Sequence, residues 1–265
     1  MSTKRAVMKI ISLAENTSSK EGIGAEHGLS LYIETKEHRI LFDAGQTGMF
    51  ADNARALGID LSLVDIAILS HGHYDHGGGM LTFLSINGRA PLYVSKHAFG
   101  NYYNGTEKYI GLAPELSHSD RLILTEGEHR IDGSLTLISA HGMNRPYDLG
   151  SFGLTEKIDG RFVPDSFDHE QYLLIEEEGA RVLISGCSHK GILNIAGHFS
   201  PDVLVGGFHF SKLECDAALA EYAKILSRHD TDYYTCHCTG TAQYEYMRTF
   251  MPRLAYLAGG DEIVI

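Results

Sequence analysis

Strand-like and helix-like segments alternate along the 265 residues, and this alternation predicts an α/β fold. The first supporting observation is a continuous apolar run at 64–69, which has the length of a strand covered on both faces. The second is a pair of hairpin patterns, at 29–43 and 172–185, in which β-rich runs flank a short turn. The third is a repeated succession of apolar strand, Ser-His dipeptide and helix, at Ser70-His71 and again at Ser188-His189.

The elements of the first half follow from local composition. A hairpin is expected from strands 29–35 and 39–43, because β-forming residues flank the Lys36-Glu37-His38 turn. Gly58 ends a short helix expected at 52–57. The other expected elements are strands at 64–69, 91–95, 121–125 and 134–140 and a helix at 80–86.

The second half repeats this order. Its expected elements are a hairpin of strands 172–176 and 181–185, a helix at 192–198, a strand at 202–205, an amphipathic helix at 215–228, a strand at 231–235, a helix near 242–250 and a strand near 262–265. We therefore expect one domain over residues 1–265 with two similar halves. Residues 99–120 and 142–168 lack clear periodicity and are expected to be loop or lid insertions.

Composition and charge restrict the classes of molecule that the protein is expected to bind. The formal charge of −12 argues against nucleic acid, which needs a basic footprint, but admits an anionic small molecule because a bound dication reverses the local potential. No run approaches 18 apolar residues, so no membrane span is expected. Lys9 interrupts the apolar run after Lys4 and Arg5, so we expect a cytoplasmic protein without a secretory signal. The sequence leaves open whether the protein forms a homo-oligomer.

Three imidazoles and a carboxylate fall within six residues, directly after the apolar run. His71 and His73 alternate and can approach one cation, while Asp75 and His76 lie beyond the bend and can face a second. Imidazole nitrogen and carboxylate oxygen suit zinc, and also manganese or iron. The glycines at 77–79 are expected to allow a tight turn and to leave room for a ligand. This pattern predicts a metal centre.

The HxHxDH pattern formed by His71, His73, Asp75 and His76 resembles the signature of the metallo-β-lactamase superfamily. The resemblance implies a four-layer αββα sandwich. Asp43 matches the upstream aspartate of that superfamily, which usually orients a ligand histidine by accepting its other N–H.

A closer resemblance covers nearly the whole chain. It is carried by the segments 25–30, 41–46, 69–79, 186–195, 206–209 and 237–240. These segments are similar to the 7,8-dihydropterin-6-methyl-4-(β-D-ribofuranosyl)-aminobenzene-5′-phosphate synthase-like subgroup, many of whose members are known only as metal-dependent hydrolases. The resemblance implies a first metal site with His71, His73 and a later histidine, and a second with Asp75, His76 and His237.

The later histidine is either His189, which the resemblance favours, or His141, which follows the strand at 134–140. Where the superfamily often has a bridging aspartate, this chain has the sequence Gly186-Cys187-Ser188, so Cys187 is an alternative ligand. The expected cofactor is Zn²⁺, as one or two ions, with Mn²⁺ or Fe²⁺ as alternatives. Cys236 and Cys238 alternate with His237 in what is expected to be an extended segment, so they are interpreted as packing residues.

We expect hydrolysis of a phosphorylated or otherwise anionic small molecule, because a bound dication lowers the pKa of water toward about 7. Asp75 would take or relay the proton, and Arg145, Lys190 or His209 would stabilise developing negative charge. Expected substrate contacts are Glu26, His27 and Lys190. Two alternatives remain: a synthase-like transferase that uses a phosphoribosyl donor, and a non-catalytic metal or ligand sensor, which the intact motif disfavours.

Overall fold

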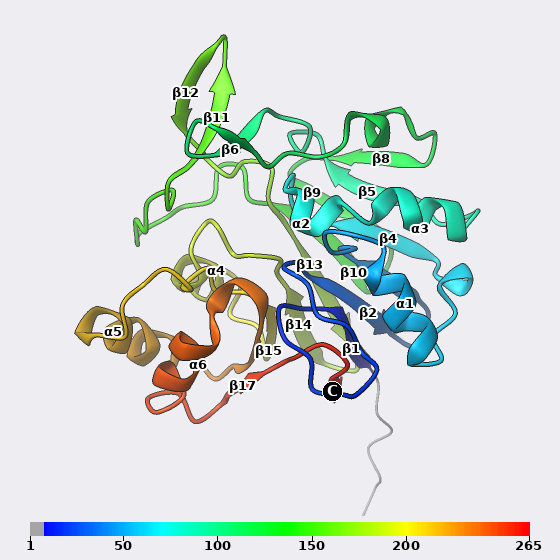
Figure 1. The fold of residues 1–265 in the computed structure, drawn as a ribbon. Helices are drawn as coiled ribbons and strands as arrows, with labels where there is room; N and C mark the ends of the chain where they lie inside the picture. The colour runs from blue at the N-terminus through cyan, green and yellow to red at the C-terminus, as the bar shows by residue number, and fades with distance from the viewer. Residues whose placement is uncertain (1–7) are drawn as a thin grey trace, which may run out of the picture. The chain divides into compact units, whose positions relative to one another are not determined.

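The computed structural model describes residues 8–265, which fall into two compact units (Figure 1). In the described part, unit 1 contains residues 8–94, 112–124 and 258–265, and unit 2 contains residues 95–111 and 125–257. Lys4 and Arg5, which bear on the expected absence of a secretory signal, lie outside the described residues. Between residues 8 and 265, no helix combines the length and the apolar character needed to cross a membrane.

Unit 1 contains a seven-stranded mixed sheet with the order β18-β1-β2-β3-β4-β5-β8. Its strands are β1 (Lys9–Ala14), β2 (Ser30–Glu34), β3 (Arg39–Phe42), β4 (Ile66–Leu69), β5 (Leu92–Ser95), β8 (Leu122–Thr125) and β18 (Glu262–Val264). The predicted hairpin is present as β2 and β3, which pair antiparallel, whereas β3 and β4 are parallel. Because neighbouring parallel strands end at the same edge, Asp43 after β3 and Ser70 after β4 begin adjacent loops.

Strand β1 was not among the predicted elements, which began at residue 29. It lies inside the sheet, where it pairs antiparallel with both β2 and β18. Five of its six residues are buried. The pairing joins residues near the two ends of the chain, so a local pattern alone could not identify it as a central strand.

The helices of unit 1 are α1 (Met49–Ala56), α2 (Tyr74–Gly77) and α3 (Met80–Ile86), with short 3-10 helices at Leu61–Leu63 and Pro114–His118. The prediction of a helix at 80–86 is confirmed at both ends. Helix α1 begins three residues before the predicted start at residue 52, and its Phe50 and Ala54 are fully buried. Helix α2 is the single turn that contains Asp75 and His76.

Unit 2 contains a second seven-stranded mixed sheet with the order β17-β16-β15-β14-β13-β10-β9. Its strands are β9 (Glu128–Arg130), β10 (Leu135–Ser139), β13 (Gln171–Glu177), β14 (Ala180–Ile184), β15 (Val203–Gly206), β16 (Asp232–Thr235) and β17 (Leu254–Tyr256). Strands β13 and β14 form the predicted antiparallel hairpin, and β14, β15, β16 and β17 are parallel. The loops after β14, β15 and β16 therefore begin at one edge.

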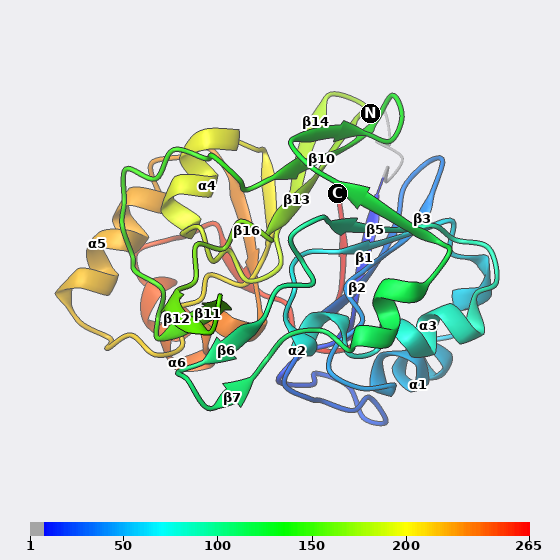
Figure 2. The ribbon, with the colours of Figure 1, turned by 90° about the horizontal axis from the view of Figure 1, so that it is seen from above.

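Helices α4 (Ile192–Phe199), α5 (Ala217–Leu226) and α6 (Thr241–Met247) lie on one side of this sheet (Figure 2). Their apolar side chains share a buried cluster with Tyr172, Leu183, Leu204 and Tyr233, which come from four neighbouring strands. The alternate positions of the strands are buried as well, as in the run from Gln171 to Ile175. Strands buried on both faces explain the continuous apolar runs in the sequence.

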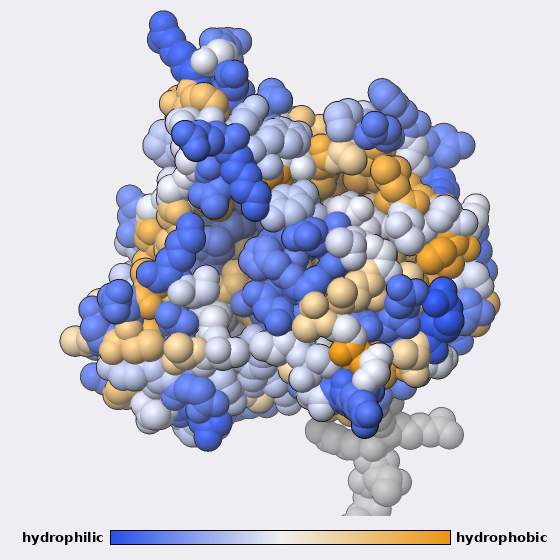
Figure 3. All heavy atoms as spheres, viewed as in Figure 1, coloured by the Kyte–Doolittle hydropathy of each residue, from blue (hydrophilic) through white to orange (hydrophobic). Residues whose placement is uncertain are grey.

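A small four-stranded sheet with the order β12-β11-β6-β7 completes unit 2. Its strands are β6 (Tyr102–Asn104), β7 (Lys108–Tyr109), β11 (Leu154–Ile158) and β12 (Arg161–Pro164). These strands come from the two stretches that were expected to be insertions, and their role as a lid stays a prediction. The tip of the β11–β12 hairpin is mostly hydrophilic (Figure 3), as suits a turn exposed to water.

Candidate metal centre

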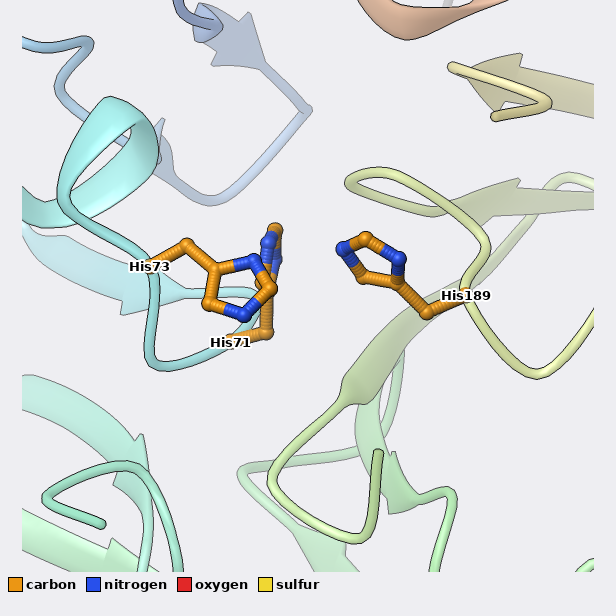
Figure 4. Close-up of side chains that lie close together, drawn as sticks. All are labelled: His71, His73 and His189. Carbon is orange, nitrogen blue, oxygen red and sulfur yellow. The ribbon is translucent and has the colours of Figure 1, made fainter. Parts of the chain in front are cut away.

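In unit 1, the loop after β4 and helix α2 bring the residues of the HxHxDH motif together. His71 and His76 are fully buried, and His73 is 3% exposed. The ring centroid of His71 lies 4.6 Å from that of His73 and 4.2 Å from that of His76. Figure 4 shows the rings of His71 and His73 beyond the end of β4, and that of His189 in the loop after β14. Three buried imidazoles in one short segment are unusual without a function for them.

One buried carboxylate fixes two of these histidines. Asp43 is fully buried; its Oδ1 accepts the Ser70 backbone N–H at 2.7 Å and its Oδ2 accepts the Ser70 hydroxyl at 2.7 Å. The same Oδ2 lies 2.6 Å from Nδ1 of His76, and Ser70 Oγ lies 2.8 Å from Nδ1 of His71.

These contacts assign the imidazole tautomers. A carboxylate only accepts, so His76 donates its Nδ1–H to Asp43. The single hydroxyl proton of Ser70 also goes to Asp43, so His71 must donate its Nδ1–H to Ser70 Oγ. Both rings then carry the lone pair on Nε2, which is the form of imidazole that coordinates a cation. The structure thus gives Asp43 the orienting contact that the resemblance implied and adds Ser70, which sequence reasoning missed.

Backbone contact between two loops explains the glycines that follow the motif. Gly78 and Gly79 have helical or near-helical backbone angles. A Cβ on Gly78 would lie 2.2 Å from the Gln46 carbonyl oxygen, and one on Gly79 would lie 2.1 Å from that of Ala44. Gly78 and Gly79 do form the expected turn, between α2 and α3, but the space beside them is filled by the backbone of the loop after β3 and is not left for a ligand. They let the motif loop contact the loop after β3, which carries Asp43.

Asp75 and His27 extend the unit 1 cluster toward solvent. Asp75 Oδ2 lies 3.2 Å from His27 Nε2 and 3.9 Å from His76 Nε2. Two ligand atoms that are each about 2 Å from one cation are at most about 4 Å apart, so Asp75 and His76 fit a shared ion. Glu26 accepts three hydrogen bonds from Gln46 and Thr47 and so fixes that loop, and its expected contact with substrate stays a prediction.

In unit 2, the loop after β14 places His189 in the interior. His189 is 1% exposed, and its ring stacks on Phe167 with centroids 4.5 Å apart. Its backbone N–H and that of Lys190 donate to the fully buried carboxylate of Glu170, at 2.8 and 3.1 Å. Tyr172 donates its hydroxyl to Glu170 at 2.7 Å. Glu170, which sequence reasoning missed, fixes this loop much as Asp43 fixes the motif loop.

Cys187, His237 and Cys238 form a buried group in unit 2, with their ligand atoms all within 4.8 Å of one another. The expectation that Cys238 points away from His237 is wrong, because residues His237–Thr239 form a 3-10 turn rather than an extended segment. Burial acts to raise the pKa of the Cys238 thiol, but its contacts with Cys187 and His209 and the charge of His237 lower that pKa well below its usual value.

His209 belongs to the same region of unit 2. Its ring centroid lies 4.4 Å from that of His189 and 4.6 Å from that of Phe152. Its Nδ1 is buried and has no hydrogen-bond partner among residues 8–265. His209, His237 and Ser188 all have positive φ, at 56°, 49° and 58°. Such strained backbone in non-glycine residues often accompanies functional sites.

His141 and Lys190 meet at a different carboxylate. His141 is 53% exposed in its side chain, and its Nδ1 lies 3.2 Å from Asp168 Oδ2. The buried Lys190 places its Nζ 2.6 Å from Asp168 Oδ1. Arg145 lies 4.0 Å from Asp148, and its Nε is buried without a hydrogen-bond partner among the described residues. Of these expected site residues, His141 and Lys190 are thus held by one acidic side chain.

Comparisons with known proteins identify the family to which the chain belongs. A family model described as the metallo-beta-lactamase superfamily matches residues 23–225. The chain therefore belongs to the metallo-β-lactamase superfamily, and it has the α/β fold of that family.

Similar proteins narrow the class. An uncharacterized protein of Methanocaldococcus jannaschii is 30% identical over 239 residues, which cover 86% of this chain and 89% of that protein. The 7,8-dihydropterin-6-methyl-4-(beta-D-ribofuranosyl)-aminobenzene-5'-phosphate synthase of the same organism is 28% identical over 290 residues and covers 97% and 96%. The crystal structure of Tm1679, a metal-dependent hydrolase of the beta-lactamase superfamily, matches with a TM-score of 0.82 and 29% identity, covering 97% and 99%. These matches confirm both resemblances stated from the sequence, to the superfamily and to the synthase-like subgroup.

Proposed function

We propose that this protein is a hydrolase that uses one or two divalent cations to act on a phosphorylated or otherwise anionic small molecule. The observation that carries the proposal is the pair of buried imidazoles, His71 and His76, whose tautomers are both set by Asp43 and Ser70. A purely structural histidine pair would not need both Nε2 lone pairs directed away from their supporting hydrogen bonds.

The first site in this proposal takes His71, His73 and His189. His189 is preferred over His141 because it is buried beside Cys187 and His209, whereas His141 is exposed and bound to Asp168. The carboxylate of Asp168, which also binds Lys190, contacts His141 and so competes with a ligand role for that histidine.

The second site takes Asp75, His76 and His237. The nitrogen and oxygen donors fit Zn²⁺ best, and the Asp75 carboxylate also admits Mn²⁺ or Fe²⁺. When bound, such a cation lowers the pKa of a coordinated water toward about 7 and polarises the oxygen under attack.

The protein's own residues supply the rest of the chemistry. Asp75 accepts the proton of the attacking water, and His27, 3.2 Å away, holds that carboxylate and connects it to solvent. His209 and Arg145 each have a buried nitrogen without a hydrogen-bond partner in the described chain, which suits a role toward a substrate anion. Because Lys190 is already paired with Asp168, its charge acts on the substrate anion only at a distance.

A His73→Ala variant tests the proposal. Metal content is measured by mass spectrometry, and hydrolysis is screened on phosphoesters, lactones and thioesters. We expect the wild type to bind metal and to hydrolyse at least one anionic ester, and the variant to lose both properties. His38→Ala, which changes a surface-turn histidine, is the matched control and should behave as wild type. Full activity of the metal-free variant would refute the mechanism.

The second candidate function is a transferase that uses a phosphoribosyl donor. It is supported by the synthase of M. jannaschii, which is 28% identical and covers 97% of this chain. In this case the cation and Arg145 would stabilise a leaving pyrophosphate rather than an ester oxygen. Incubation with a phosphoribosyl donor and p-aminobenzoate, followed by a pyrophosphate assay, tests it. Absence of pyrophosphate release from metal-loaded protein counts against it.

A further inference from the structure

Two buried sulfur atoms lie beside a proposed ligand histidine in unit 2. The Sγ atoms of Cys187 and Cys238 and a ring nitrogen of His237 are all within 4.8 Å of one another. The three residues are 3%, 6% and 1% exposed. Two sulfurs that share one zinc ion, each at about 2.3 Å, are at most roughly 4.6 Å apart. The observed separations, which are 4.8 Å or less, are therefore close to those of one coordination sphere.

The surrounding backbone preserves space for these sulfurs. A Cβ on Gly207 would lie 2.4 Å from the Cys238 Sγ, so only glycine leaves that position to the thiol. The turn that carries Cys238 is tied to the loop after β15, because Phe208 donates its N–H to Thr239 Oγ1 at 2.8 Å. A further hydrogen bond joins Cys238 Sγ to the Cys187 carbonyl oxygen at 3.5 Å. The two cysteines are thus held by contacts between three loops.

We propose that Cys187, Cys238 and His237 form a thiolate-containing binding set for a thiophilic divalent cation, zinc or cobalt. The inference rests on the proposed function in that it uses His237, and it adds two sulfur ligands that distinguish this centre from one of nitrogen and oxygen donors alone. Each thiol transfers its proton to solvent as its sulfur binds the cation, so charge balances without an oxidant. Soft sulfur ligands shift selectivity away from Mn²⁺ and toward zinc.

Cobalt loading tests this inference, because a thiolate ligand gives cobalt a near-ultraviolet charge-transfer band that nitrogen and oxygen ligands do not. We expect the band in the wild type, loss of about half its intensity in Cys187→Ser and in Cys238→Ser, and complete loss in the double variant. Cys236→Ser, a buried control on the same segment, and Cys215→Ser, an exposed control, should keep the full band.

The outcomes separate this inference from the proposed function. Bound cobalt without the band, or a band that persists in the double variant, overturns the inference and leaves a nitrogen and oxygen centre in place. Absence of any bound metal overturns both. X-ray absorption of zinc-loaded wild type, which requires no variant to fold, counts the sulfur neighbours: two support the inference and none refutes it.

Discussion

The Asp43→Asn substitution tests the support of the metal centre directly. An amide of the same shape keeps one accepting oxygen for the Ser70 backbone N–H but places an NH₂ group where Oδ2 stood. That group donates to Ser70 Oγ and to Nδ1 of His76, so the Ser70 hydroxyl turns to donate to Nδ1 of His71. Both rings would then carry their proton on Nε2, which is the wrong tautomer for binding a cation.

The size of the effect follows from these contacts. Removing one residue that orients a metal ligand typically costs 10–100-fold in metal affinity. Because Asp43 orients two of the proposed ligand rings, one directly and one through Ser70, we expect the upper end, about 100-fold, which corresponds to about 2.8 kcal/mol. Loss of one charge-assisted hydrogen bond, at about 1.5–3 kcal/mol, gives the same magnitude.

Competition with a chelating dye measures the metal affinity of the wild type and of the Asp43→Asn variant. Asp168→Asn is the control, because that carboxylate is partly buried and contacts Lys190 and His141 rather than the rings of the motif. Thermal unfolding of the metal-free proteins separates loss of folding from loss of binding. If Asp43→Asn folds and binds metal as tightly as wild type, the assignment of the two tautomers is refuted.

Three further predictions concern stability. Glu170→Gln should lower the free energy of unfolding by about 1–3 kcal/mol in urea titrations, because a buried acceptor of three hydrogen bonds gains a donor; an unchanged midpoint would refute its role. Gly79→Ala should destabilise the protein by at least about 1–3 kcal/mol, because the new methyl group clashes with the carbonyl oxygen of Ala44. Gly197→Ala, in a helix with open space around it, should stabilise the protein by about 0.5–1 kcal/mol. Equal effects of the two variants in calorimetry would contradict this prediction. Burial acts to raise the pKa of Asp168, but the Lys190 ammonium holds it below the usual 3.8. The carboxylate therefore adds stability at neutral pH that is lost as the pH falls through this lowered pKa. The melting temperature of Asp168→Asn should thus lie below that of wild type at pH 7, and the difference between the two should close as the pH falls below about 3.8. A difference that does not change with pH would exclude the mechanism.

Local pattern was sufficient for most of the regular elements. The helix at 80–86 and the hairpins around residues 36 and 178 were predicted from periodicity and turn residues, because those signals depend only on neighbours within a few positions. Strand β1 was not predicted, because its place in the sheet depends on pairing with β18, a strand some 250 residues later in the chain.

The proposed metal ligands of the motif were likewise suggested by spacing, since a metal centre built on one loop would have its donors adjacent in the sequence. The residues that support or extend the centre were not. Glu170 and Ser70 act through contacts that form only after the strands pair, and Cys238 faces His237 because a 3-10 turn replaces the extended backbone expected there.

The sequence by itself thus determined the fold family, the order of most elements and the residues of the motif that are proposed as ligands, all of which depend on local propensity or on adjacent side chains. Only the tertiary structure decided which imidazole nitrogen is protonated, why Gly78 and Gly79 follow the motif, and which cysteines join the cluster. Those features depend on distances of 2–5 Å between atoms of separate loops, and such distances are set by packing rather than by any single segment.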